Sequence, residues 1–220
     1  MKHYGDITKI KGSELPVVDV ICGGSPCQDL SVAGSRGGLS AERSGLFLEQ
    51  IRIIKEMREH DKSSGRPDEF VRPRYAIWEN VPGALSSPGK ANKGKDFQRV
   101  LTEFARIAEP ECPDIPLPNK GEWSKAGCIY DEMGRWSIAW RVHDAQFWGT
   151  TQYVDGRMWH RGTPQRRKRI ALVADFAGLS APEVLLERKG LHWNPQAQPF
   201  QGQGTSGSAE KSIGESDQSG

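Results

Sequence analysis

Long hydrophobic runs are absent from this sequence of 220 residues, and no run of apolar residues is long enough to cross a bilayer. A signal-peptide pattern is also absent. An excess of charge of one sign is missing too, because 30 lysines and arginines stand against 28 acidic residues. The overall balance therefore does not indicate nucleic acid binding, and the distribution of the basic residues matters more.

Cysteine is scarce, with four residues in the chain and no Cys-x-x-Cys pair among them. No histidine lies beside them at the spacing of metal ligands, so we expect neither a zinc site nor a disulfide framework, and no metal. This usage is typical of a reducing compartment. We therefore expect a cytoplasmic protein with no membrane partner.

Apolar residues make up only 36% of the chain, whereas glycine and proline are common, with 25 and 14 residues. Residues 199–220 are rich in glycine, serine and glutamine and hold almost no apolar side chains. That composition predicts a linker or a disordered tail. We expect the folded domain to occupy residues 1–198.

Short apolar runs alternate with helical patterns along the folded part. Apolar residues at helical spacing predict helices over 46–60 and 96–107, the second capped by Asp96. The alternation of strands and helices predicts an α/β fold with a mostly parallel sheet, in which ligands bind at the carboxyl ends of strands. Strands are expected at 17–22, 75–78, 136–142 and 170–174, the third half-buried and the others buried.

Cys27 directly follows the first expected strand, in the loop Gly24-Ser-Pro-Cys-Gln28. A thiol in a loop at the carboxyl edge of a sheet, beside small residues, suits a nucleophile. The alternative is a buried structural cysteine, which is the commoner fate of a lone cysteine. We expect Cys22, which lies inside the strand, to be such a structural cysteine.

Two further polar segments adjoin strands. Glu79 follows the second expected strand and lies at the same sheet edge as Cys27 if the two strands are near neighbours; a surface or capping carboxylate is the alternative. The basic run 165–169 leads into the last strand, where alternation places Arg167 and Arg169 on one face. A solvated basic stretch, or a phosphate grip without catalysis, is the alternative.

These segments, in this order, resemble successive motifs of the C5-cytosine DNA methyltransferases. The resemblance runs from about Tyr4 to about Asp175 and implies a Rossmann-like sheet that uses S-adenosylmethionine. The motifs that carry it are Gly5-Asp-Ile-Thr8, Gly24-Ser-Pro-Cys-Gln-Asp-Leu-Ser31, Arg43-Ser-Gly-Leu-Phe47, Glu79-Asn-Val81 and Gln165-Arg-Arg-Lys-Arg169.

The resemblance implies methyl transfer from S-adenosylmethionine to C5 of a cytosine that is flipped out of double-stranded DNA. Cys27 would add to C6 of the base as a thiolate, and Glu79 would place an acid beside N3. Arg167 would donate to the base carbonyl O2, and Arg169 would help to hold Glu79 and the base.

The resemblance also implies a cofactor site. Asp6 would bind the adenine amino group, Ile7 would pack on the ring, and Leu46 would line the pocket. Pro26 would contribute backbone near the methionine part. The residues that would contact the substrate are Gln28, Ser31, Asn80 and Gln165, the first two in a loop over 28–44 that would close over the base.

Parts of the family's pattern are absent. We find no Phe-x-Gly-x-Gly turn for the methionine moiety, no acidic residue for the ribose, and neither a target-recognition domain nor a final helix. We therefore expect an incomplete catalytic domain. It is an active enzyme, an inactive fragment, or one half of an enzyme whose second chain supplies the missing segments. A non-enzymatic DNA-binding domain is a further alternative.

Residues 151–163 are an insertion relative to the family's usual pattern, and they are rich in aromatic and basic residues. A DNA-contacting loop and a tolerated surface insertion explain this segment equally well. By resemblance, the setting is a restriction-modification system or a phage, with a nucleoid-associated protein.

Overall fold

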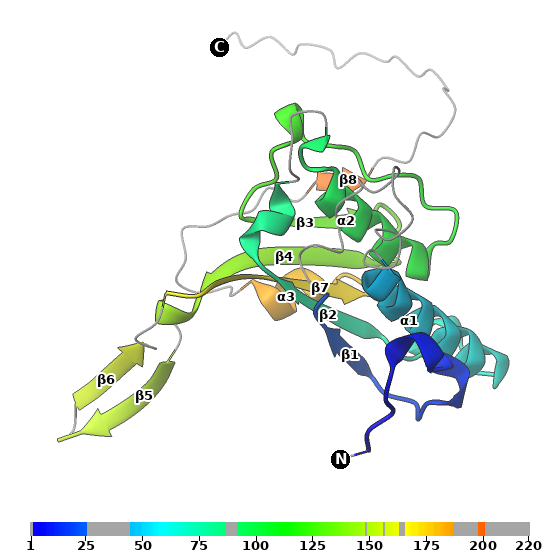
Figure 1. Cartoon of the computed structure of the whole chain (residues 1–220), viewed down its shortest axis with the longest axis horizontal. Coiled ribbons are helices and arrows are strands. Elements are labelled where there is room, and N and C mark those ends of the chain that lie inside the picture. The colour runs from blue at the N-terminus through cyan, green and yellow to red at the C-terminus, as the bar shows by residue number, and fades with distance from the viewer. Residues whose placement is uncertain are drawn as a thin grey trace, which may run out of the picture.

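The computed structural model describes residues 2–25, 45–86, 92–147, 149–155, 157–162, 166–186 and 198–200. These residues form a sheet with helices on its faces and a separate two-stranded hairpin (Figure 1). None of the helices in these ranges is long and apolar enough to cross a membrane.

The main sheet has six strands, and the predicted α/β class is confirmed. Two of its five pairings are parallel, namely β1–β2 and β3–β8, and the other three are antiparallel. The sheet is thus mixed, with fewer parallel pairings than the sequence led us to expect. In order across the sheet, the strands are β1 (Val20–Gly23), β2 (Tyr75–Asn80), β7 (Lys168–Asp175), β4 (Ser137–Asp144), β3 (Ala126–Asp131) and β8 (Gln198–Phe200).

The connections between strands explain the mixture. β1 and β2 are joined through helix α1 (Gly45–Ser63), and a helical crossover makes strands parallel. β3 and β4 are joined by a turn at residues 132–136, which makes them antiparallel. Between β4 and β7 the chain passes through a short 3-10 turn (Ala145–Phe147) and the hairpin of β5 (Gly149–Val154) and β6 (Arg157–Gly162), with no α-helix among the described residues, and β7 returns antiparallel to β4.

Helices α1 and α2 (Lys95–Ala108) cover one face of the sheet, and the short helix α3 (Ala181–Leu185) packs on the other face (Figure 1). The larger core lies under α1 and α2, where Trp78 is fully buried. Its indole ring lies 6.3 Å from the ring of Phe47 and 6.4 Å from that of Phe97, so one strand residue joins both helices to the sheet.

Strand β1 differs from the buried strand that we expected at 17–22. It begins at Val20 and forms the edge of the sheet, where it pairs only with β2 among the described strands. The side chain of Val20 is 44% exposed, and Cys22 is exposed rather than a buried structural cysteine. The expectation failed because an apolar run does not reveal whether another layer covers its second face.

Asp96 does not cap helix α2, which begins one residue earlier at Lys95. Gly94 takes the cap position with φ = 77°, in the left-handed region that glycine tolerates. The indole of Trp123 donates to the carbonyl of Gly94 at 2.8 Å, so a distant contact fixes this junction. Asp96 instead lies buried in the first turn, where the helix dipole favours a carboxylate.

The other expected elements appear with shifted bounds. The helix expected at 46–60 is α1, and the strands expected at 75–78 and 170–174 are β2 and β7. The strand expected at 136–142 is β4, which is mostly buried because it lies between two layers. Strand β3 and the hairpin at 149–162 were not anticipated. The tail was expected over 199–220, but residues 199 and 200 belong to strand β8, and residues 201–220 lie outside the described residues.

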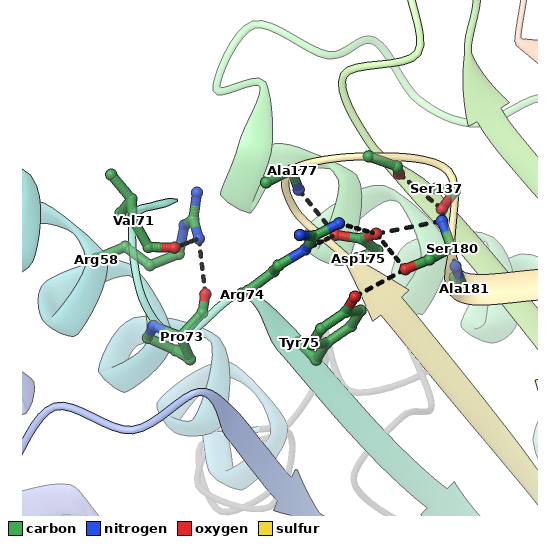
Figure 2. Close-up of polar contacts among 11 residues, drawn as sticks. Arg58, Val71, Pro73, Arg74, Tyr75, Ser137, Asp175, Ala177, Ser180 and Ala181 are labelled. Carbon is green, nitrogen blue, oxygen red and sulfur yellow. Dashed lines mark hydrogen bonds and ion pairs between the residues drawn. The ribbon is translucent and has the colours of Figure 1, made fainter. Parts of the chain in front are cut away.

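A buried carboxylate holds together the end of the sheet where β2 begins and β7 ends (Figure 2). Asp175 is fully buried and accepts hydrogen bonds from Arg74 Nε and Nη2 at 3.0 and 3.1 Å. It also accepts from Ser180 Oγ at 2.5 Å and from the backbone N–H of Ala177 at 3.0 Å. Burial opposes its ionisation, but these bonds outweigh burial and lower the pKa of Asp175.

Arg58 joins α1 to the segment that precedes β2 (Figure 2). Its Nη1 donates to the carbonyl oxygens of Val71 at 2.9 Å and Pro73 at 2.6 Å, and its guanidinium lies over the ring of Phe176. Burial lowers the pKa of Arg58 to about 10. The side chain therefore remains charged at neutral pH and fixes three segments that are distant in sequence.

Replacing Asp175 by alanine is expected to lower the free energy of unfolding by about 3 kcal/mol, because Arg74 and two backbone N–H groups lose their acceptor. Urea unfolding at neutral pH would measure this loss. Asp68→Ala, which removes the exposed partner of Lys62, serves as the control and should cost less than about 1 kcal/mol. Equal losses of unfolding free energy in the two variants would contradict the stabilising role of Asp175.

The same carboxylate predicts acid sensitivity. Its folded pKa lies below the ordinary 3.8, so its contribution is complete above that pH and disappears as the pH falls through the folded pKa. Urea midpoints measured at decreasing pH should therefore converge for the wild-type chain and Asp175→Asn. A constant difference between them would argue against the lowered pKa.

Candidate functional site

Three strand ends meet at one edge of the sheet. β1 and β2 run parallel, so their carboxyl ends lie side by side, with Gly23 opposite Trp78. β7 runs antiparallel to β2, so its first residues reach the same edge, with Ala171 opposite Glu79. Glu79, the segment that follows β1 and the start of β7 are therefore brought together, as ligand sites in α/β sheets commonly are.

Glu79 and Arg169 form an ion pair at this edge. Nε of Arg169 lies 2.6 Å from Oε1 of Glu79, and the two side chains are 33% and 52% exposed. Ala171 stands opposite Glu79, and Arg169 lies two residues before Ala171 in β7, on the same face of the sheet. An ion pair this exposed adds little to stability, so its effect is to orient the carboxylate.

Asn80 anchors the segment that leaves β1. Its side chain is buried, and its Nδ2 donates to the carbonyl of Ser25 at 2.9 Å while its Oδ1 accepts from the backbone N–H of Val81. The indole of Trp78 also donates to Ser25 Oγ at 3.4 Å. Ser25 is therefore held in a fixed position beside β2.

Gly24 brings this segment against Glu79. A Cβ at Gly24 would lie 2.9 Å from the carbonyl oxygen of Glu79 and 3.3 Å from its Oε2. Only glycine allows this approach without a shift of backbone. The carboxylate of Glu79 thus lies between Arg169 and the segment that leads toward residue 27.

Arg167 lies just before β7, with an exposed side chain. Its backbone is held at the end of β4, because its N–H donates to Asp144 Oδ1 at 3.1 Å and its carbonyl accepts from the N–H of Ala145 at 3.0 Å. Among the described residues, Arg169 forms an ion pair with Glu79 and Arg167 does not. The fixed backbone leaves the guanidinium of Arg167 pointing into solvent.

Several expected site residues lie outside the described residues, and so does the loop over 28–44. These residues are Pro26, Cys27, Gln28, Ser31 and Gln165.

A pocket of about 290 Å³ opens beside the carboxyl end of β1. Its walls are largely apolar and include Ile7, Ile21, Leu46 and Ile53, and the backbone of residues 23–25 forms another side. Ile7 and Leu46 were both expected from the sequence to line a cofactor site, and the structure brings them together from segments almost forty residues apart.

Gln50 is a polar residue of this pocket that sequence reasoning missed. It is buried, and its Nε2 has no hydrogen-bond partner within the described ranges. The side chain packs against Gly23, where a Cβ would lie 2.6 Å from Nε2. The available signal was its position on the apolar stripe of α1 between Phe47 and Ile54. A buried amide without a partner is a candidate ligand contact.

Asp6 lies next to the pocket-lining Ile7. Its Oδ1 accepts from the backbone N–H and Oγ1 of Thr8 at 3.0 and 2.9 Å, and these bonds lower the pKa of Asp6. Arg52 of α1 donates to the carbonyl of Ile7 at 3.2 Å, which docks this short 3-10 turn (Ile7–Lys9) on the helix. An anionic carboxylate is therefore held near the apolar pocket.

The cysteines in the described part of the chain are poor nucleophiles or lie in the pocket wall. Burial and the nearby Glu109 raise the pKa of Cys112 to about 11, and burial raises the pKa of Cys128. Cys22 lines the pocket. Among the described residues, no group of three or more histidine, cysteine, aspartate or glutamate side chains could hold a metal ion.

The chain is similar in sequence to known DNA methyltransferases. Residues 1–108 match the family model described as C-5 cytosine-specific DNA methylase. The chain is 35% identical over 184 residues to the Type II methyltransferase M.NgoBV of Neisseria gonorrhoeae, covering 84% of this chain and 31% of that protein. It is 26% identical over 172 residues to the Type II methyltransferase M.BsuFI of Bacillus subtilis, covering 78% and 28%.

A further relative carries a different name. The chain is 33% identical over 213 residues to a protein of Escherichia phage P1 called DNA N-6-adenine-methyltransferase, covering 87% of this chain and 25% of that protein. The chain thus spans between a quarter and a third of the length of these three relatives.

Replacing Asn80 by alanine is expected to lower the free energy of unfolding by about 1–3 kcal/mol, because the partly buried carbonyl of Ser25 loses its donor and the N–H of Val81 loses its acceptor. Urea unfolding measures the difference. Asn119→Ala, at an exposed position of a short turn, is the matched control and should change it by less than about 0.5 kcal/mol. If both variants unfold at the wild-type midpoint, Asn80 does not anchor the segment.

Proposed function

Because residues 1–108 of this chain belong to the C-5 cytosine-specific DNA methylase family, we propose that the chain is part of an enzyme that methylates cytosine at C5 in double-stranded DNA. The observation that carries this proposal is the Glu79–Arg169 ion pair, set against the glycine of the segment that leads to Cys27. Asn80 holds Ser25 in place, and the sequence has the thiol of Cys27 two residues after Ser25.

Cys27 and Glu79 divide the work on the base. The thiolate of Cys27 bonds to C6 of a flipped-out cytosine and pushes electrons from the C5–C6 double bond toward C5 and N3. Glu79 shares a proton with N3 and thereby stabilises that electron density. After C5 has gained the methyl group, loss of its proton expels the Cys27 sulfur and restores the double bond.

The two arginines assist from different positions. Arg169 holds Oε1 of Glu79, so the carboxyl keeps a fixed direction during proton sharing. Arg167, whose backbone is fixed at Asp144 and whose side chain is exposed, donates to the base carbonyl O2. Gln28, Ser31 and Gln165 contact the DNA. Asn80 acts by holding Ser25 and is therefore a positioning residue.

The pocket beside β1 fits an adenine ring. Ile7 and Leu46 offer apolar surfaces to its faces. Asp6 directly precedes Ile7, and its carboxylate would accept from the amino group. Pro26 adds backbone on the side toward Cys27. S-adenosylmethionine, when bound, supplies an electrophilic methyl group on its sulfonium. The residues of this pocket thus fit the nucleoside part of the cofactor.

A second target atom is adenine N6, which the name of the phage P1 relative favours. The chain covers only 25% of that protein, so the name describes a protein that is mostly unmatched here. An exocyclic amine is itself the nucleophile in such a transfer and gains nothing from a thiol beside Glu79. We therefore favour C5 of cytosine and keep N6 of adenine as an outcome of the test.

The proposal extends to the organisation of the protein. Residues up to the end of β8 form part of a catalytic domain, residues 201–220 form a linker or tail, and a second chain or further segments supply the remaining cofactor contacts. The matched relatives come from bacteria and phages, so we place the enzyme in a bacterial cytoplasm, in restriction-modification or phage modification.

Cys27→Ala is expected to abolish transfer of labelled methyl from S-adenosylmethionine to cytosine in genomic DNA, because the adduct cannot form. Digestion to nucleosides identifies the labelled base. Cys128→Ala, which removes a cysteine of strand β3 that does not line the pocket, is the control and should keep the activity. Label in adenine that survives Cys27→Ala would favour the adenine alternative. Label from neither variant nor the wild type would favour an inactive fragment.

Leu46→Arg is expected to weaken binding of S-adenosylhomocysteine at least about tenfold, because a charged side chain replaces an apolar wall of the pocket. Titration calorimetry measures the dissociation constant. Leu117→Arg is the matched control, since Leu46 and Leu117 are 37% and 38% exposed and Leu117 lies in a distant loop. If the two variants bind S-adenosylhomocysteine with similar affinity, the pocket is not part of the cofactor site.

A further inference from the structure

The β5–β6 hairpin stands apart from the rest of the fold. Its two strands pair with each other, and the hairpin projects away from the six-stranded sheet (Figure 1). A lone two-stranded ribbon buries little apolar surface and is only marginally stable in water. Packing within this chain does not explain why the hairpin is there, whereas contact with a binding partner does.

The base of the hairpin is fixed beside the candidate site. Asp144, at the end of β4, accepts from the backbone N–H groups of Gln146 and Arg167 and so ties the departing strand to the returning one. Arg169 of β7 stands opposite His143 of β4 and reaches Glu79 on its other side. The hairpin therefore leaves the sheet at the edge that holds the Glu79–Arg169 ion pair.

The second strand of the hairpin and the segment after it concentrate positive charge. Residues 157–169 contain six of the 30 lysines and arginines and none of the 28 acidic residues. The rest of the chain thus holds 24 basic and 28 acidic residues, an excess of negative charge. Arg157, Arg166, Arg167 and Lys168 are exposed. Such a concentration of positive charge favours a polyanion as the binding partner over an ordinary protein surface.

The register of the hairpin sorts its residues onto two faces. Positions 157, 159 and 161 of β6 stand opposite positions 154, 152 and 150 of β5, and alternation puts all six on one face. In the sequence, these three positions of β6 are arginine, tryptophan and arginine, and the three positions of β5 are valine, glutamine and threonine. A two-stranded ribbon fits the DNA major groove, and an aromatic residue between cations suits a nucleic acid surface.

We propose that the β5–β6 hairpin is a DNA-binding arm, which lays the face of Arg157, Trp159 and Arg161 along the duplex beside the target cytosine. Arg157 and Arg161 contact phosphates, and Trp159 packs between them against sugar or base edges. The inference rests on the proposed function for the identity of the nucleic acid, and it adds the surface that grips it. The arm holds the duplex on the side of Arg167, next to the base that is attacked.

The test is binding of the full chain to a labelled duplex of mixed sequence, measured by fluorescence anisotropy between about 50 and 200 mM salt. Arg157→Gln with Arg161→Gln should weaken binding about tenfold or more and reduce the salt slope by about two, because two phosphate contacts are lost. Trp159→Ala should weaken binding without changing the slope, because an indole carries no charge.

The control is Lys120→Gln with Lys125→Gln, which removes the same charge from exposed positions on another loop and should leave the affinity and slope almost unchanged. An unfolding midpoint equal to that of the wild type shows that each variant is folded. If the arginine variant binds duplex like the wild type, or if it loses only binding to RNA or to a protein, the DNA arm is wrong.

This assay separates the two proposals. Duplex binding that depends on the arm, in a chain that transfers no methyl group, overturns the proposed reaction and keeps the arm. Methyl transfer that depends on Cys27 but is indifferent to the arginine variant keeps the reaction and overturns the arm.

Discussion

Strand β2 hydrogen-bonds to β1 on one side and to β7 on the other, and both the core and the candidate site depend on this double pairing. Successive side chains of β2 take opposite roles because they alternate between faces: Trp78 fills the core under both helices, while Glu79 emerges at the edge. The antiparallel direction of β7 then delivers Arg169 to Glu79. A parallel neighbour would have presented its other end there.

The sequence predicted the parts of the fold whose periodicity is strong. The apolar stripes of α1 and α2 and the apolar runs of β2 and β7 were recognisable because each buries one complete face or both. The exposure of β1 could not be predicted, because it depends on which elements pack against the strand and not on the composition of the strand. The hairpin at 149–162 has polar and aromatic residues without a core to mark it, so it was expected only as an insertion.

The candidate site divides in the same way. Order along the chain placed Glu79 and Arg169 at strand ends, and the structure pairs them through register, which no single motif contains. Ile7 and Leu46 meet because the first turn docks on α1 through Arg52. Gln50 could not be predicted from the sequence, because its significance is that its amide has no hydrogen-bond partner among the described residues, which only the structure shows. The roles of Cys27 and its loop rest on the resemblance alone.

The two ends of β7 carry opposite kinds of ionic contact. Arg169 lies in an exposed ion pair at one end, and Asp175 lies in a buried network at the other. Six residues of extended strand separate them by about 20 Å, beyond the distance at which mutational effects usually couple. Free-energy changes introduced at the two ends should therefore add. Substitutions that strengthen the network around Asp175 should therefore stabilise the protein without disturbing the ion pair at the other end.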